Sequence, residues 1–188
     1  MYQVLSLSSN IMVGILHLNA FSNHCKALNR QKLLEEGKTF ILREQAILPE
    51  ALHYNAEGKP FLLNSKVGLS ISHTSELLCM AFNSLGCIGI DLETPRPALM
   101  KVAAKFLTPQ EMQSVGQSLS ALCGYWCAKE ALFKYHGVKG AFLKSHFNVT
   151  GLWPHLEGCI VDPFRRAIPL KGFNYKTHMG VCAYEESA

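Results

Sequence analysis

Short apolar runs separated by polar turns predict β-strands along much of the chain. Four such runs lie in the first half, at residues 11–18, 67–71, 77–82 and 87–92. The tetrapeptide Asn-Ser-Leu-Gly joins the last two runs and predicts a hairpin loop. Three more apolar runs predict strands towards the C-terminus, at residues 147–149, 159–161 and 178–184.

Apolar residues at helical spacing predict a helix in the first half, from Leu28 to Leu48. Ser22 or Asn23 is the candidate N-cap, and Pro49 marks the end of the helical pattern. Gly37, inside this stretch, indicates either a break or a point of close packing.

Two further helices are predicted in the second half. Thr108 is the expected N-cap of the first, with Pro109 at its first helical position and Glu111 completing a capping box. The second helix runs over residues 119–135 and is ended by Gly137.

The segment Thr94-Pro95-Arg96-Pro97 predicts a boundary, which divides the chain into residues 1–94 and 95–188. Each part contains helical material followed by antiparallel strands. The expected fold class is therefore α+β, with two similar halves packed together.

The composition of the 188 residues narrows the class of protein. Hydrophobic residues make up 48% of the chain and charged residues 17%, which indicates a globular core and excludes a disordered chain. The net charge of +4 suits an anionic ligand or an acidic partner protein, but it is too weak and too evenly spread for a nucleic-acid binder. No apolar stretch is long enough to span a membrane, and the start lacks the basic region of a signal peptide. We expect a cytoplasmic protein.

The seven cysteines predict reduced thiols, because the count is odd and no C-x-x-C motif occurs. Cys123 and Cys127 are one helical turn apart. With no histidine or cysteine pair at metal-binding spacing nearby, core packing is favoured over a zinc site.

Acidic residues at two places in the chain indicate a site for a divalent cation. Asp91 and Glu93 alternate with Ile90 and Leu92, so a strand would place both carboxylates on one face. Later in the chain, Glu130 and Lys134 are four apart, so a helix would place them on one face. Three carboxylates and an ammonium group at one place suit a hard cation and a phosphate.

The alternative is that both segments are ordinary surface features. Glu130 and Lys134 would then form an exposed ion pair that stabilises the helix by roughly 0.2–0.5 kcal/mol. Against this, the strand is otherwise apolar, and Trp126 lies on the helix face that carries Glu130. Lys129 lies about 100° away from that face, so its role would differ.

Five segments in order give the chain a recognisable pattern. They are Gly58-Lys59-Pro60, Ser70-Ile71-Ser72-His73, Gly89-Ile90-Asp91-Leu92-Glu93, Lys105-Phe106-Leu107-Thr108 with Glu111, and Trp126-Cys127-Ala128-Lys129-Glu130 with Lys134. In this order and at this spacing they resemble the 4′-phosphopantetheinyl transferases, specifically the Sfp-type branch with two similar halves in one chain.

The resemblance implies an enzyme that transfers the 4′-phosphopantetheine arm of coenzyme A to a serine of an apo acyl- or peptidyl-carrier protein. Adenosine 3′,5′-bisphosphate is released. The implied cofactor is Mg²⁺, with Mn²⁺ as the other candidate, and the implied ligands are Asp91, Glu93 and Glu130. Glu130 ranks first and Glu93 second as the base for the serine hydroxyl, and Lys134 would neutralise phosphate charge.

The resemblance also implies that Lys59, Ser72 and His73 surround the nucleotide and its 3′-phosphate. Arg30, Lys38 and Arg43 are further candidates there, and a solvated helix face is an equal alternative for them. We expect a monomer that binds coenzyme A and a carrier protein. Two alternatives remain open: a non-catalytic coenzyme A or carrier-protein binding module of the same fold, and a Mg²⁺-dependent phosphohydrolase.

Overall fold

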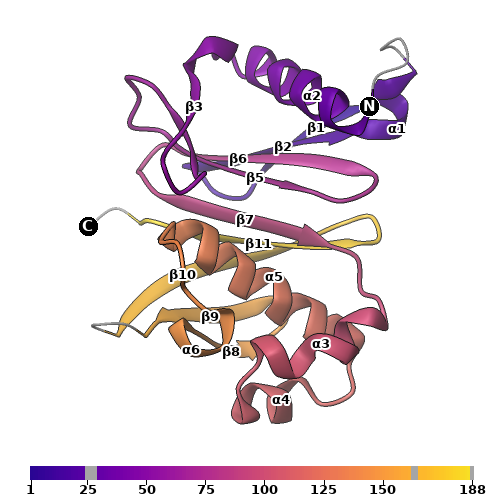
Figure 1. Cartoon of the computed structure of the whole chain (residues 1–188), viewed down its shortest axis with the longest axis vertical. Helices are drawn as coiled ribbons and strands as arrows, with labels where there is room; N and C mark the ends of the chain where they lie inside the picture. The colour runs from indigo at the N-terminus through magenta and orange to yellow at the C-terminus, as the bar shows by residue number, and fades with distance from the viewer. Residues whose placement is uncertain (24–28, 162–164, 187–188) are drawn as a thin grey trace.

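The protein is built from two antiparallel sheets whose inner faces pack together, with a long helix on each outer face (Figure 1). The computed structural model describes residues 1–23, 29–161 and 165–186. The first sheet has the order β1-β2-β6-β5, with strands β1 (Tyr2–Ser6), β2 (Ile11–His17), β5 (Gly68–His73) and β6 (Leu77–Asn83). The second sheet has the order β7-β11-β10-β9-β8, with strands β7 (Ile88–Glu93), β8 (Phe147–Leu152), β9 (His155–Ile160), β10 (Arg166–Tyr175) and β11 (His178–Tyr184). A separate small hairpin pairs β3 (Leu52–Tyr54) with β4 (Pro60–Leu62).

The helices connect and cover these sheets. They are α1 (Leu18–Ser22), α2 (Arg30–Glu44), the 3₁₀ turn η1 (Pro49–Ala51), α3 (Ala98–Phe106), α4 (Pro109–Val115), α5 (Leu119–His136) and α6 (Leu143–His146). The capping box at Thr108 is confirmed, and Gly137 ends α5 in the left-handed conformation as predicted. The predicted cap of the first long helix was wrong: Asn29 caps α2 by accepting a hydrogen bond from the Lys32 amide. Ser22 instead lies in the short α1.

Three apolar layers hold the fold together. Helix α2 packs on the first sheet through residues such as Ile41 and Leu78, and α5 packs on the second sheet through residues such as Leu132 and Val181. The middle layer, which includes Val13 and Ile90, joins the inner faces of the two sheets. Each strand alternates its side chains between two of these layers, which is the period of two that an extended strand imposes.

Gly37 is a point of close packing and not a break. A Cβ atom there would lie 2.9 Å from Cδ2 of Leu78 and 3.1 Å from Cδ2 of Leu16. Helix α2 continues through it to Glu44. The missing side chain therefore lets the helix approach the first sheet closely.

Two expectations about the strands are corrected by the pairing. The loop at residues 83–86 does not form a hairpin, because β6 pairs with β2 and β5 while β7 pairs with β11. The boundary predicted after Thr94 therefore falls one strand late, since β7 belongs to the sheet of the C-terminal part. Four of the described strands were not predicted: β1 and β10, in which mixed polar and apolar residues hide the alternation, and β3 and β4, which have only three residues each.

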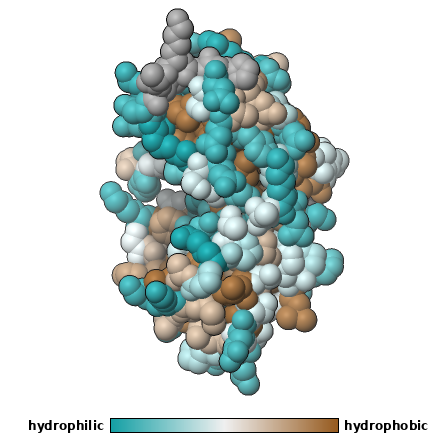
Figure 2. Space-filling view, turned by 90° about the vertical axis from the view of Figure 1, so that its right-hand side faces the viewer, coloured by the Kyte–Doolittle hydropathy of each residue, from teal (hydrophilic) through white to brown (hydrophobic). Residues whose placement is uncertain are grey.

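The α+β class is confirmed by this arrangement. No helix among the described residues is both long and apolar enough to cross a membrane. Figure 2 shows one face of the molecule, on which hydrophobic residues form separate small areas among hydrophilic ones. The six described cysteines are free thiols, and Cys79, Cys123, Cys127 and Cys182 are buried. Cys25 and the predicted helical position Leu28 lie outside the described residues.

Candidate active site

Helix α5 lies directly on β7, and this contact places the acidic strand beside the helix (Figure 1). A Cβ atom on Gly89 would lie 2.0 Å from the Ala131 carbonyl oxygen and 2.5 Å from the Tyr135 amide nitrogen. Only glycine allows such an approach of backbone to backbone. The alternation along β7 then turns Asp91 towards the helix, while Ile90 packs in the middle layer.

Asp91 is bound from two sides. The Lys134 ammonium lies 2.8 Å from Asp91 Oδ1 and also donates to the Ile90 carbonyl at 2.9 Å. The Ser72 hydroxyl donates to the same Oδ1 at 2.8 Å. Asp91 is only 8% exposed, so these charge-assisted bonds hold a nearly buried carboxylate.

Glu130 lies one turn before Lys134 on α5 and is half-buried. Burial raises the pKa of the Glu130 carboxyl above its ordinary value, and the negative charge of Asp91 raises it further, while Lys134 opposes both. Asp91 is paired with the Lys134 ammonium, and the Glu130 carboxyl lies within electrostatic reach of both groups. A second cation bound between the two carboxylates would relieve the excess negative charge.

Glu93 points to a different partner. Its Oε2 lies 2.8 Å from the Arg96 guanidinium, and its Oε1 accepts a hydrogen bond from the Thr94 amide at 2.9 Å. The structure thus brings Asp91 and Glu130 together but not the Glu93 carboxylate. In residues 1–23, 29–161 and 165–186, no group of three or more histidine, cysteine, aspartate or glutamate side chains is arranged to hold a metal ion.

The residues nevertheless fit Mg²⁺. This ion is usually held by one or two carboxylates together with waters and substrate phosphates, and not by a protein cage. The two described partners of the Asp91 side chain both lie on Oδ1, which leaves Oδ2 for a cation. Glu130 is the second carboxylate within electrostatic reach. The role of Glu93 as a third ligand stays a prediction.

The two serines of Ser70-Ile71-Ser72-His73 bridge the sheets. Strand β5 is an edge of the first sheet and β7 an edge of the second. The Ser70 hydroxyl accepts from the Ile90 amide at 3.0 Å, and the Ser72 hydroxyl accepts from the Leu92 amide at 3.3 Å. The serines thereby satisfy backbone donors that have no strand partner on that side. Their spacing of two matches the spacing of the amides on β7.

His73 lies among positive charges. It is exposed at the end of β5, and its pKa is lowered by partial burial first and then by the charges of Arg30, Lys134 and Lys38. Lys38 also bonds to the Tyr54 hydroxyl at 2.9 Å. Arg30 donates to the carbonyls of Thr74 and Ser75, directly after His73. These cations suit an anionic ligand that spans α2 and β5.

Arg43 is not part of this group. It lies in the last turn of α2 and is exposed. A separation of thirteen residues places it about 20 Å along the helix from Arg30. No described contact joins Arg43 to another predicted site residue, so its role at the nucleotide stays a prediction without geometric support.

Lys59 lies beside a cavity of about 210 Å³. Its ammonium donates to the Tyr135 carbonyl at 2.6 Å, and burial lowers the pKa of Lys59. The cavity is enclosed by the Gly58-Lys59-Pro60 turn, by β5 and by the C-terminal end of α5, and its lining includes Lys134 and Phe133. The structure therefore places Lys59 and Lys134 on one cavity, although they are far apart in the sequence.

Comparison with known proteins finds similarity to phosphopantetheinyl transferases. The family model of the 4′-phosphopantetheinyl transferase superfamily matches residues 87–171. A Synechocystis protein named "Putative 4′-phosphopantetheinyl transferase" is 30% identical over 112 residues, which cover 53% of this chain and 46% of that protein. A Haemophilus influenzae protein of the same name is 25% identical over 126 residues, covering 62% and 53%. The matched part therefore spans about half the length of these curated relatives.

The family match covers one side of the site only. Asp91, Glu93, Glu130 and Lys134 lie within residues 87–171, whereas the nucleotide-side candidates of the first sheet and α2 lie before them. The family-model match thus includes the β7–α5 contact and the part of the second sheet up to Lys171. The first sheet and α2 have to be judged from their own geometry.

Lys129, the neighbour of Glu130, points into the core. It forms a fully buried ion pair with Glu111 at 2.7 Å and donates to the carbonyls of Leu143 and Phe147. Trp126 is also partly buried, with its ring centroid 4.9 Å from that of Phe106. The segment from Trp126 to Lys134 therefore serves two purposes, with one face of α5 in the core and the other at the site.

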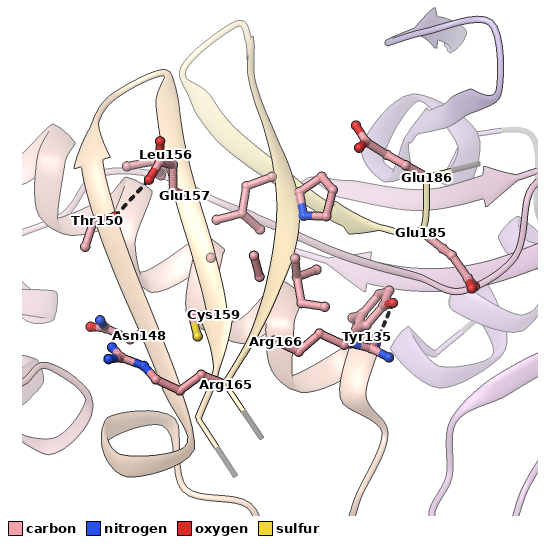
Figure 3. Close-up of a pocket in the computed structure, with 15 residues that line it drawn as sticks. Tyr135, Asn148, Thr150, Leu156, Glu157, Cys159, Arg165, Arg166, Glu185 and Glu186 are labelled. Carbon is pink, nitrogen blue, oxygen red and sulfur yellow. Dashed lines mark hydrogen bonds between the residues drawn. The ribbon is translucent and has the colours of Figure 1, made fainter. Parts of the chain in front are cut away.

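A cavity of about 800 Å³ lies elsewhere (Figure 3). It is a groove along β9 and β10 that reaches Glu185 and Glu186, which follow β11. Arg166 donates to the Tyr135 hydroxyl at 2.8 Å there. None of the predicted site residues lines this groove. We place the chemistry at Asp91, because a functional site needs convergent polar groups and not only volume.

Sequence reasoning gave Ser70 no role of its own, although Ser70 belongs to the Ser70-Ile71-Ser72-His73 segment. Ser70 and Ser72 are two residues apart, so a strand places both hydroxyls on one face. This spacing could have indicated that the two serines act as a pair. Arg30 was a candidate for the 3′-phosphate, but its contacts to the carbonyls of Thr74 and Ser75 depend on how α2 crosses the first sheet.

Proposed function

We propose that the protein is an Sfp-type 4′-phosphopantetheinyl transferase, in which two similar halves enclose one site. It would transfer the phosphopantetheine arm of coenzyme A to a serine hydroxyl of an apo acyl- or peptidyl-carrier protein, in a Mg²⁺-dependent reaction. The observation that carries this proposal is the convergence of Asp91, Glu130 and Lys134 on the β7–α5 contact, inside the stretch that the superfamily model matches.

The proposed reaction is a displacement at the β-phosphorus of coenzyme A. The carrier serine oxygen forms a new bond to this phosphorus, its proton passes to a carboxylate, and adenosine 3′,5′-bisphosphate leaves. Mg²⁺ held by Asp91 and Glu130 would polarise the pyrophosphate and stabilise the leaving phosphate. Glu130 is the first candidate for the proton acceptor, because its raised pKa brings it closer to neutral pH. Glu93 is the second.

Lys134 supports the proposal by its hydrogen bonds. An ammonium group has three donors. Two are used on the Ile90 carbonyl and Asp91 Oδ1. The third can bond to a pyrophosphate oxygen next to the cation, which would neutralise charge that develops on the leaving phosphate.

The cations of the first sheet and α2 support the nucleotide side. Arg30 and Lys38 offer positive charge for the 3′-phosphate, and the imidazole of His73 beside them can donate a hydrogen bond to it. Lys59 and its cavity offer a place for the remaining nucleotide. The mildly basic chain, with a net charge of +4, also suits an acidic carrier protein. We propose a cytoplasmic monomer.

Intact mass spectrometry tests the function directly. The full chain is incubated with coenzyme A, Mg²⁺ and a set of apo acyl- and peptidyl-carrier proteins. We expect at least one carrier to gain the mass of one phosphopantetheine, and this gain to vanish with EDTA or with Asp91→Ala. If no carrier gains mass, the transferase assignment is wrong. Tight coenzyme A binding without transfer would then favour a binding module, and release of phosphate would favour a hydrolase.

A further inference from the structure

Strands β5 and β7 lie side by side without forming a regular ladder, and two serine hydroxyls take the place of backbone acceptors. The Ser70 and Ser72 side chains are both buried, at 3% and 5% exposure. Each accepts a hydrogen bond from one amide of β7. Both serines therefore have the same contact with the edge of β7, one hydrogen bond from one backbone amide each.

They differ in where the hydroxyl proton goes. The Ser72 hydroxyl donates to Asp91 Oδ1 at 2.8 Å, so both its donor and its acceptor function are used inside the protein. Ser70 has no such bond to a carboxylate among the described residues. Ser72 thus ties the backbone of β7 and the side chain of Asp91 to one atom of β5.

We propose that Ser72 is a positioning residue for Asp91, which fixes the carboxylate so that Oδ2 faces the cation. This inference rests on the proposed function, because the cation belongs to that reaction. Ser72 from β5 and Lys134 from α5 approach the same oxygen from different elements. Two donors on Oδ1 set the rotation of the carboxylate and leave the second oxygen as a preformed ligand.

A fixed ligand matters more at this site than at a cage of many ligands. Mg²⁺ demands near-ideal octahedral geometry, and a site with only two protein carboxylates has few contacts to impose it. Outer-shell hydrogen bonds to a metal ligand typically contribute 10–100-fold to metal affinity. Loss of the Ser72 hydroxyl should therefore weaken cation binding without removing any ligand.

The test compares Ser72→Ala with Ser70→Ala, because both variants lose one buried acceptor for an amide of β7. The full chain is titrated with Mn²⁺, and the free ion is measured by electron paramagnetic resonance, with and without coenzyme A. Thermal unfolding should show a similar loss of Tm in both variants. We expect Ser72→Ala to bind Mn²⁺ about tenfold more weakly, and Ser70→Ala to stay within about twofold of the wild type. Ser72→Thr, which keeps the hydroxyl, should recover most of the affinity.

Equal Mn²⁺ affinity in Ser72→Ala and Ser70→Ala, whether normal or reduced, would overturn the inference. The transfer assay on the same samples separates this from failure of the proposed function. A wild type that transfers the arm while Ser72→Ala binds Mn²⁺ normally leaves the transferase and removes only the positioning role. A wild type that binds no Mn²⁺ under either condition overturns both. A wild type without transfer, but with weaker Mn²⁺ binding in Ser72→Ala alone, supports positioning and rejects the transferase.

Discussion

The Lys129 ammonium lies 2.7 Å from Oε2 of Glu111, and both side chains are buried. Glu111 also accepts hydrogen bonds from the amides of Thr108 and Val149. The pair therefore joins α4, α5 and β8 at one place. It lies next in sequence to Glu130, yet it stabilises the fold and does not face the site.

Lys129→Met should destabilise the protein strongly. Removal of the ammonium leaves the Glu111 carboxylate buried without its counter-ion, which typically costs about 3–5 kcal/mol. Urea unfolding followed by circular dichroism measures this loss. Lys101→Met, at an exposed position of α3, is the control and should stay within about 0.5 kcal/mol. A Lys129→Met protein of normal stability that cannot transfer would show that Lys129 acts in the reaction itself.

Gly89→Ala should separate α5 from β7. The new Cβ would meet the Ala131 carbonyl at 2.0 Å, and backbone atoms cannot yield as a side-chain tip can. We expect a loss of about 3 kcal/mol in the free energy of unfolding, at the upper end for overpacking, together with loss of transfer. Gly37→Ala is the matched control, since its Cβ would meet only leucine methyl groups. Equal effects in the two variants would argue against the close contact of α5 and β7.

Glu130→Gln should make the metal-free protein more stable at neutral pH and inactive. Burial and Asp91 raise the pKa of Glu130 above its ordinary value of 4.5. Ionisation of Glu130 therefore opposes folding, and this cost is absent below the ordinary pKa and complete above the raised one.

The stability gain of Glu130→Gln should accordingly be near zero at about pH 4 and grow as the pH rises towards about pH 8. Urea unfolding in EDTA across this range measures it, with the exposed Glu36→Gln as control. Transfer should fall at least about a hundredfold, as for a lost general base. A gain that is equal at all pH values would contradict the electrostatic argument.

His73→Ala should weaken the binding of coenzyme A about tenfold and leave dephospho-coenzyme A almost unchanged. The reason is that a hydrogen bond to a charged group contributes about 1.5–3 kcal/mol, and dephospho-coenzyme A lacks the 3′-phosphate. Isothermal titration calorimetry with both ligands measures the difference. Lys101→Ala, at an exposed position of α3, is the control and should bind both ligands like the wild type. If His73→Ala weakens both ligands equally, His73 does not contact the 3′-phosphate.

Local patterns in the sequence predicted most single elements correctly. The capping box at Thr108, the end of α5 at Gly137 and strands such as β6 and β11 depend on residues close together in the chain. Pairing was harder. The loop after β6 has the composition of a hairpin, but β7 pairs with β11, which lies about ninety residues later in the chain. The composition of a turn indicates that the chain reverses direction there. It does not indicate which strand the next strand will pair with.

At the candidate site too, the sequence predicted local features but not the contacts between distant segments. The sequence alone predicted that Asp91 lies on the same strand face as Glu93, and that Glu130 and Lys134 lie on one face of a helix. Both follow from local properties, the periods of two and 3.6 residues. Only the tertiary structure decided that α5 lies against β7 at Gly89, that Glu93 turns to Arg96 and that Lys129 is buried. It also decided that Ser72 bonds to Asp91. Except for the local pair of Glu93 and Arg96, these contacts join segments far apart in the chain. They depend on how whole layers pack, and no spacing within one segment encodes them.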